Sequence, residues 1–322
     1  MTKRKLKPVL HGDWWLIGPS PDLRGILPGA EKWLSDWEAG AKKEEHNAPV
    51  DHHLMQDPLG TWHLWGCVRA TAVGRILYHW KTDNILDTPW ESTGEIIRVD
   101  RGLGESVRGK EECIQSPYFL KVDDTYHMFY GGGSTEDASE TRKNAQMCLM
   151  SSTDGVNWSR YRNESGTSRL FAGPGPTRDP CVIKIGDLWH LYYAGAREND
   201  VNRPAFWCRT SEDLLIWSEP IMVHEDAQYG SQRWDTECPH VVYRNGFYYL
   251  FRTVEYNSAN THVFRSEDPL DFGVGDASDK HVCRFPVGAP ELYSIADEEY
   301  VTSNHNPPLG TQMCRMKWVE QS

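Results

Sequence analysis

Three acidic residues stand at matching places in a pattern that recurs along this 322-residue chain: Asp51, Asp179 and Glu237. Each precedes a strand-like run that ends in a turn and returns as an aromatic strand. Two carboxylates in one cleft can cleave a glycosidic bond, because one protonates the leaving oxygen while the other attacks the sugar or activates water. Crowding of like charges helps to keep one of the two protonated near neutral pH. The three acids are therefore candidates for acid/base catalysis.

The elements that must position these acids are β-hairpins. In the clearest copy, residues 234–240 form a polar loop, residues 241–244 an apolar strand, and Asn245 and Gly246 a type I′ turn, because both residue types readily take positive φ angles. Related hairpins occur at residues 52–65, 116–130 and 179–193, with a weaker copy at 289–301. The five copies recur about every 60 residues, which is typical of a repeat architecture.

A second signature follows the hairpins: a Ser-x-Asp sequence and then an aromatic residue, at residues 152–158, 211–217 and 266–272, with a looser copy at 82–90. Ser and Asp side chains bond nearby backbone N–H groups and close turns, so this motif predicts a structural staple. Each repeat then holds two hairpins, or four antiparallel strands. We expect an all-β fold, a five-bladed β-propeller of four-stranded antiparallel blades closed by an N-terminal strand.

The expected blades span residues 50–100, 113–160, 178–220, 237–275 and 287–319 of a single domain over residues 1–322, and residues 10–20 supply the closing strand. A short helix is expected across residues 31–43. In a propeller, the starts of the innermost strands converge at one face. This convergence adds Ser116 to the expected pocket. It also places three histidines there, His52, His53 and His240, which could bind sugar or metal. Two tryptophans, Trp65 and Trp234, could stack on a sugar ring.

Two short motifs carry a resemblance to known families. Arg178-Asp179-Pro180 and Glu237-Cys238-Pro239 resemble motifs of glycoside hydrolase family 32, the β-fructosidases, and residues 237–250 are similar to the acid-bearing hairpin of family 43, the arabinofuranosidases and β-xylosidases. Both families have the five-bladed propeller, and the resemblance covers about residues 50 to 303. It implies Glu237 as general acid, Asp179 as the carboxylate that stabilises the transition state or tunes the acid, and Arg178 as a ligand of sugar hydroxyls.

Asp51 is the third acid, expected as nucleophile or base. Family 32 carries Asn-Asp-Pro-Asn-Gly in its first blade, which the run from Gln56 to Gly60 resembles, but the repeat frame assigns Asp57 to a turn. Asp51 lies 11 residues before Trp62, as Glu237 lies 11 before Tyr248. The adjacent His52 and His53 depart from both families. Retention or inversion of anomeric configuration depends on the separation of the two acting carboxylates, about 5–5.5 Å or about 6.5–9.5 Å respectively.

Composition excludes several classes of partner. The net charge of −12 disfavours nucleic acid and anionic membranes. The basic start of the chain lacks the apolar run of a signal peptide, and the eight cysteines include no Cys-x-x-Cys pair, so we expect reduced thiols in a cytoplasmic protein. No cofactor and no metal ion is implied, and the oligomeric state is left open.

These observations favour a glycosidase that releases a terminal furanoside or pentose, such as a fructosyl, arabinosyl or xylosyl group, from a small saccharide. About 20 residues follow the fifth hairpin, which ends at residue 301, so we expect no C-terminal β-sandwich of the kind usual in family 32. The alternatives are a non-catalytic carbohydrate-binding propeller and a glycoside phosphorylase on the same fold. A sialidase would also fit the Ser-x-Asp repeats, but that family uses six blades.

Overall fold

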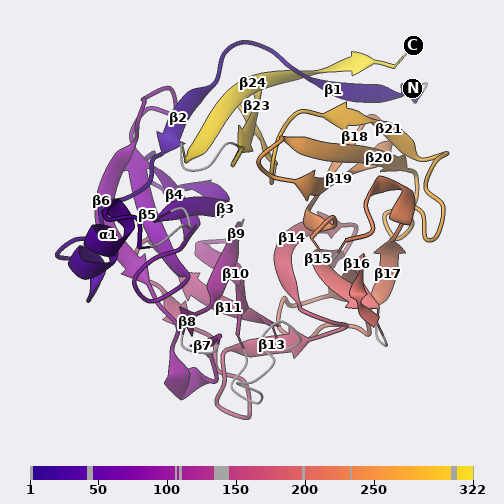
Figure 1. Ribbon diagram of the computed structural model, residues 1–322. Helices are drawn as coiled ribbons and strands as arrows, with labels where there is room; N and C mark the ends of the chain where they lie inside the picture. Colours follow the sequence, from indigo (N-terminus) through magenta and orange to yellow (C-terminus); the bar gives the residue numbers. More distant parts are fainter. Residues whose placement is uncertain are drawn as a thin grey trace. The chain divides into compact units, whose positions relative to one another are not determined.

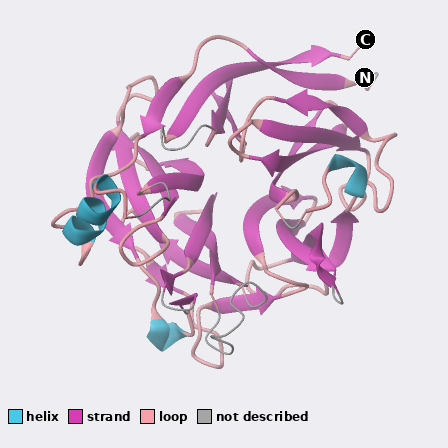
Figure 2. Cartoon of the chain, viewed as in Figure 1, coloured by secondary structure: helices cyan, strands magenta, loops and turns pink. Residues whose placement is uncertain are grey.

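The computed structural model describes residues 3–41, 46–105, 107–108, 111–133, 145–197, 200–232, 234–305 and 310–321. The chain divides into two compact units, one made of Met1–Trp15, Gly173–Asn306 and Gln312–Ser322, the other of Leu16–Ala172 and Pro307–Thr311. Strands dominate both units (Figure 2). Over the described ranges, no helix is long and apolar enough to span a bilayer.

Over its described residues, the unit that contains residues 16–172 holds two large sheets and one small two-stranded sheet. The first has the strand order β3 (Ala48–Gln56), β4 (Trp62–Arg69), β5 (Ile76–Thr82), β6 (Glu91–Ile97). The second consists of β9 (Ile114–Val122), β10 (Thr125–Gly132) and β11 (Gln146–Ser152), and two short strands share its outer position, β12 (Ser159–Arg160) and β13 (Arg169–Ala172). Smaller elements are α1 (Ala30–Glu38), η1 (Arg101–Leu103) and the two strands of the small sheet, β7 (Val107–Arg108) and β8 (Glu111–Glu112). The predicted helix therefore exists and ends earlier than expected; residues 42 and 43 lie outside the described residues.

The other unit holds three sheets. One has the order β14 (Arg178–Ile185), β15 (Leu188–Arg197), β16 (Asp200–Ser211), β17 (Ile221–His224), and the next has β18 (Glu237–Arg244), β19 (Phe247–Glu255), β20 (Asn260–Ser266), β21 (His281–Phe285). The last has β22 (Glu291–Ile295), β23 (Glu298–Ser303), β24 (Thr311–Glu320), β1 (Leu6–Leu10). The remaining elements are η2 (Ala227–Tyr229) and β2 (Trp15–Gly18), which crosses from one unit to the other along the chain.

An N-terminal strand completes the last sheet. β1 pairs antiparallel with β24 from Leu6 opposite Glu320 to Leu10 opposite Met316 (Figure 1). The five antiparallel sheets and this closing strand confirm the predicted fold class, a five-bladed β-propeller. The strand β1 begins upstream of the expected residues 10–20, and β2, which lies within them, also pairs with β24. Outer strands β13, β17 and β21 lie beyond the expected blade ends at 160, 220 and 275. A single domain over residues 1–322 stays a prediction.

The predicted turns have the expected geometry. Asn245 and Gly246 both have positive φ, 51° and 92°, as a type I′ turn requires. In the Ser-x-Asp motif of the third blade, Asp213 Oδ1 accepts hydrogen bonds from the backbone N–H groups of Leu215 and Ile216 at 2.9 and 2.8 Å. Trp217 Nε1 donates to the carbonyl of Leu214 at 3.0 Å, so the aromatic residue of the motif also bonds the turn.

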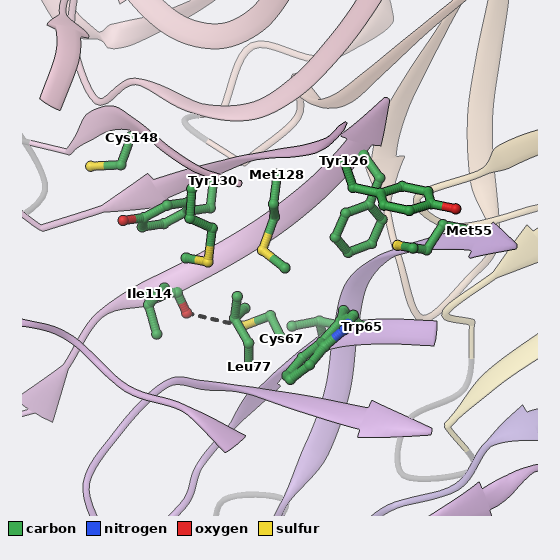
Figure 3. Packing of buried hydrophobic residues seen from close by; sticks show 12 residues of the cluster. Met55, Trp65, Cys67, Leu77, Ile114, Tyr126, Met128, Tyr130 and Cys148 are labelled. Carbon is green, nitrogen blue, oxygen red and sulfur yellow. Dashed lines mark hydrogen bonds between the residues drawn. The ribbon is translucent and has the colours of Figure 1, made fainter. Parts of the chain in front are cut away.

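A hydrophobic core joins β3, β4 and β5 to β9, β10 and β11 (Figure 3). Met55, Trp65 and Met128 belong to this cluster, and Cys67 Sγ contacts the carbonyl oxygen of Ile114 at 3.6 Å. Val50 and Ile114 are also members. Each lies within two residues of a candidate site residue, Asp51 or Ser116, so the core fixes the backbone from which those side chains project.

Candidate active site

A β-bulge opens the first strand of four sheets, and each carries a predicted site residue or its neighbour. The register shifts there, so that two residues on the first strand lie opposite one on the second. The first bulged residue has positive φ in each case, and the same backbone occurs before β22. The five residues are Asp51 (37°), Ser116 (55°), Asp179 (58°), Cys238 (52°) and Ala289 (50°). Non-glycine residues in this region are uncommon and concentrate at functional sites.

The bulges correct the repeat frame read from the sequence. Asp51, Asp179 and Cys238 are the equivalent positions, and Glu237 lies one residue earlier, equivalent to Arg178. Equal spacing from the following aromatic residue misplaced Asp51, because the hairpin turn after β3 is longer than the two-residue turn after β18. Four of these five positive-φ residues are followed by proline. Proline has no N–H to leave unpaired, which suits a position where the ladder is interrupted.

Arg178 lies between two of the three candidate acids. Its Nη2 donates to Glu237 Oε1 at 2.9 Å, and its Nε lies 3.5 Å from Asp179 Oδ2. Arg178 and Asp179 are buried and Glu237 is partly buried. Burial opposes the charge on Arg178, but the Asp179 and Glu237 carboxylates raise the pKa of the guanidinium above its usual value. Arg178 is therefore a permanent cation that holds the carboxylates of two successive blades in one cluster.

The backbone beside Glu237 fixes Asp179 from a second direction. The N–H of Cys238 donates to Asp179 Oδ2 at 3.2 Å, the same oxygen that faces Arg178. Cys238 Sγ in turn lies 2.6 Å from the hydroxyl of Tyr256. Tyr256 comes from the loop between β19 and β20 and was not among the predicted site residues. The repeat could not indicate it, since this loop lies outside the recurring motifs.

His240 faces protein groups rather than open space. Its Nδ1 lies 2.8 Å from Glu291 Oε2, and in the neutral ring with its proton on Nδ1 the backbone N–H of Leu292 donates to Nε2 at 3.3 Å. Burial disfavours the imidazolium, whereas the carboxylate of Glu291, with a smaller effect of Cys181, raises the pKa of His240. The ring joins β18 to β22, and contact with a sugar would require these interactions to break.

In the other unit, Asp51 and Ser116 lie together. Ser116 Oγ donates to Asp51 Oδ2 at 2.9 Å, and both side chains are buried. His53 packs against the ring of Tyr118, with ring centroids 4.2 Å apart, and its Nδ1 accepts from the backbone N–H of Phe119 at 3.2 Å. His52 is buried as well. The two histidines are thus held by packing next to the bulge.

The two predicted stacking tryptophans differ in exposure. Trp65 is 1% exposed, stacks on His79, and donates from Nε1 to the carbonyl of Gly155 at 3.1 Å. Figure 3 shows it inside the core, which corrects the expected sugar contact: neither face of its ring is accessible. Trp234 is 46% exposed and lies three residues before Glu237. Of the two, Trp234 can offer a ring to a ligand.

Solved structures share this fold at low sequence identity. A thermostable family-43 glycoside hydrolase matches with a TM-score of 0.61 and 16% identity, over 85% of this chain and 90% of its own. The α-L-arabinofuranosidase from Lactobacillus brevis matches with a TM-score of 0.59 and 13% identity, over 83% and 90%. The family 32 β-fructofuranosidase of Bombyx mori matches with a TM-score of 0.55 and 17% identity, over 90% and 67%. At such identities the likeness concerns the fold.

No protein-family model matches the chain, and no curated protein matches it.

Proposed function

We propose that this protein is a glycoside hydrolase that releases a terminal furanoside or pentose from a small saccharide. The observation that carries the proposal is the Arg178 cluster, which places Asp179 and Glu237 together at the bulged starts of two successive blades. The activities named for the similar structures, α-L-arabinofuranosidase and β-fructofuranosidase, favour this substrate class. We extend the proposal to a cytoplasmic location, in keeping with the cysteine pattern of the sequence.

In the proposed mechanism the protonated form of Glu237 gives its proton to the glycosidic oxygen as the bond to the leaving group breaks, and the second carboxylate, or a water that it activates, forms the new bond to the anomeric carbon. Arg178 already contacts Oε1, so the carboxylate that forms after proton transfer meets a cation in place. Asp179 stays ionised beside Arg178 and can stabilise positive charge on the sugar ring. Asp51 is the proposed second catalytic carboxylate, acting as nucleophile or as base, and Ser116 orients it through the 2.9 Å hydrogen bond.

The test is hydrolysis of a panel of aryl furanosides, aryl pyranosides and short fructans by the wild type and by Glu237→Gln. We expect one saccharide class to be turned over and kcat to fall by about 10³-fold in the variant, because the amide cannot donate the proton. Glu212→Gln, at an exposed position of the third-blade staple, is the matched control and should keep wild-type kcat.

Two results would contradict the proposal. Wild-type kcat in Glu237→Gln would remove this residue from the role of acid. A panel with no turned-over member, together with retention of the same sugars on the immobilised protein, would indicate a binding propeller instead. Assays with added phosphate separate hydrolysis from phosphorolysis, since only a phosphorylase would depend on phosphate and release a sugar phosphate.

A further inference from the structure

Residues 225–236 connect the third blade to the fourth along the chain. The segment follows β17, includes the short helix η2 and ends at Glu237, the first residue of β18. It also carries the exposed Trp234. Over the described part of the segment, residues 225–232 and 234–236, the backbone forms one isolated bridge, between Glu225 and Val274, and no extended ladder with a neighbouring strand. Its course must therefore be set largely by side chains.

One buried side chain contacts the segment at three points. Arg252, on β19, is 1% exposed and donates to three backbone carbonyls: Nη1 to Asp226 at 2.9 Å, Nη2 to Gly230 at 2.7 Å and Nε to Asp235 at 2.8 Å. A planar guanidinium with donors in fixed directions can join three acceptors in this way. These three bonds span both ends and the middle of the segment.

The partners of Arg252 make it an unusual buried cation. Burial lowers the pKa of Arg252 to about 10, against the attraction of Asp226, Asp235 and Glu225, so the group remains charged at neutral pH. Its hydrogen bonds go to carbonyl oxygens rather than to a carboxylate. An apolar side chain would fill the same space without the desolvation cost of a charge. The arrangement is better explained by what it holds in place than by stability.

His224 braces the guanidinium from the other side. Its Nδ1 donates to the carbonyl of Phe272 at 2.9 Å, which leaves Nε2 as an acceptor for Arg252 Nη1 at 3.2 Å. Burial and the charge of Arg252 lower the pKa of His224 to about 3, so the ring is neutral and can accept at any ordinary working pH. The guanidinium is thereby fixed by a side chain as well as by the segment.

We propose that Arg252 is a positioning residue that fixes residues 226–236 and so sets where Trp234 and Glu237 stand toward a bound saccharide. Thr253, the next residue on β19, lies directly opposite Glu237 in the sheet, so β19 holds both the segment and the strand that carries the candidate acid. The part played toward a saccharide rests on the proposed function. The fixing of the segment does not depend on it.

Hydrogen–deuterium exchange with peptide mass spectrometry tests the fixing directly. In Arg252→Met we expect exchange across residues 226–236 to accelerate about tenfold or more, because amides such as those of Gly230 and Asp235 lose their fixed turns. Arg252→Lys should give nearly the same acceleration, since one ammonium cannot reach three separated carbonyls. Arg265→Met is the matched control: Arg265 lies on β20 of the same sheet and contacts Gln321 and the ring of Phe247.

Kinetics on the saccharide that the wild type turns over gives the second measurement. We expect KM to rise and kcat to fall about tenfold or more in both Arg252 variants, with the control unchanged. A purely structural role would lower the thermal midpoint and leave kcat per folded molecule intact. Unchanged exchange in Arg252→Met, or full restoration of exchange protection by lysine, would overturn the inference. A wild type that hydrolyses nothing would defeat the proposed function, while the exchange result would still decide whether Arg252 fixes the segment.

Discussion

Arg178 is the residue whose loss should be felt most widely in the candidate site. In Arg178→Met the carboxylates of Asp179 and Glu237 lose their shared cation while remaining in protein surroundings. We expect the free energy of unfolding at pH 7 to fall by about 3 kcal/mol, the scale of breaking a buried ion pair from one side. Urea unfolding of the wild type and the variant measures this difference.

The same variant has an expected pH dependence. As the pH falls, the two carboxylates that have lost their cation can take up protons. The difference in free energy of unfolding between the wild type and Arg178→Met should therefore shrink between pH 7 and pH 4. Arg24→Met is the control, because Arg24 forms an exposed ion pair with Asp22, and exposed ion pairs contribute little to the free energy of unfolding. If Arg178→Met loses no more free energy of unfolding than Arg24→Met does, the buried cluster contributes no more stability than an exposed ion pair.

For individual residues, the sequence identifies candidates where they lie in contiguous motifs. Arg178, Asp179 and Glu237 stand in short, distinctive runs that single them out as candidates; their catalytic and binding roles stay predictions, and the contact between Arg178 and Glu237 is observed. Tyr256 and Arg252 could not be singled out, since their contacts depend on the course of loops and on carbonyl groups that every residue has. Trp65 was misjudged for a related reason: an aromatic residue at a repeated strand position can face either a ligand or the core.

Among the elements, the Ser-x-Asp staples offer a clear test. Backbone N–H groups of Ile216 and Leu215, in that order, hold the pKa of Asp213 below its usual range. Asp213→Ala should lower the free energy of unfolding at pH 7 by about 1 kcal/mol, similar to the loss of a helix N-cap. Because the folded pKa is depressed, this contribution is present above the usual Asp value and is lost as the pH falls through the folded value.

Thermal unfolding at pH 7 and at low pH measures that contribution, and Glu212→Ala in the same turn is the matched control. Equal effects of the two substitutions would contradict the assigned role of Asp213. The staples and the Asn245 turn were predictable because their chemistry is local to a few residues. The bulges were not, because residues on both faces are buried where these strands begin, so the shift in alternation caused by one extra residue is hidden and appears only in the pairing register.

At the scale of the whole molecule, each unit contains a histidine that is buried in the neutral form. Burial lowers the pKa of His79 to about 3 and that of His224 to about 3, with smaller effects of His63 and Arg252 respectively. The unfolded chain binds a proton at each site near pH 6.5. Stability should therefore fall as the pH drops from 6.5 toward 3, by about 2 kcal/mol for each histidine at pH 5.

The measurement is the free energy of unfolding between pH 4 and pH 7. His224→Gln should reduce the slope of unfolding free energy against pH by the amount that corresponds to one bound proton, although it also weakens the contact to Arg252. An unchanged slope would show that His224 does not titrate on unfolding as expected. The fold itself could be predicted at this scale because five repeats impose it, whereas the sugar could not, because specificity lies in individual side chains of the loops.

The pairing of β1 with β24 also has a consequence for synthesis on the ribosome. Arg4 and Glu320, which form an ion pair beside this ladder, are separated by 316 positions. A growing chain cannot complete its last sheet until β24 has been synthesised, so the β1 segment remains unpaired while the other four sheets form. During that interval its unpaired backbone N–H and C=O groups can pair with another chain and promote aggregation. We expect this protein to depend on chaperones that shield nascent chains more than a fold with only local strand pairs would.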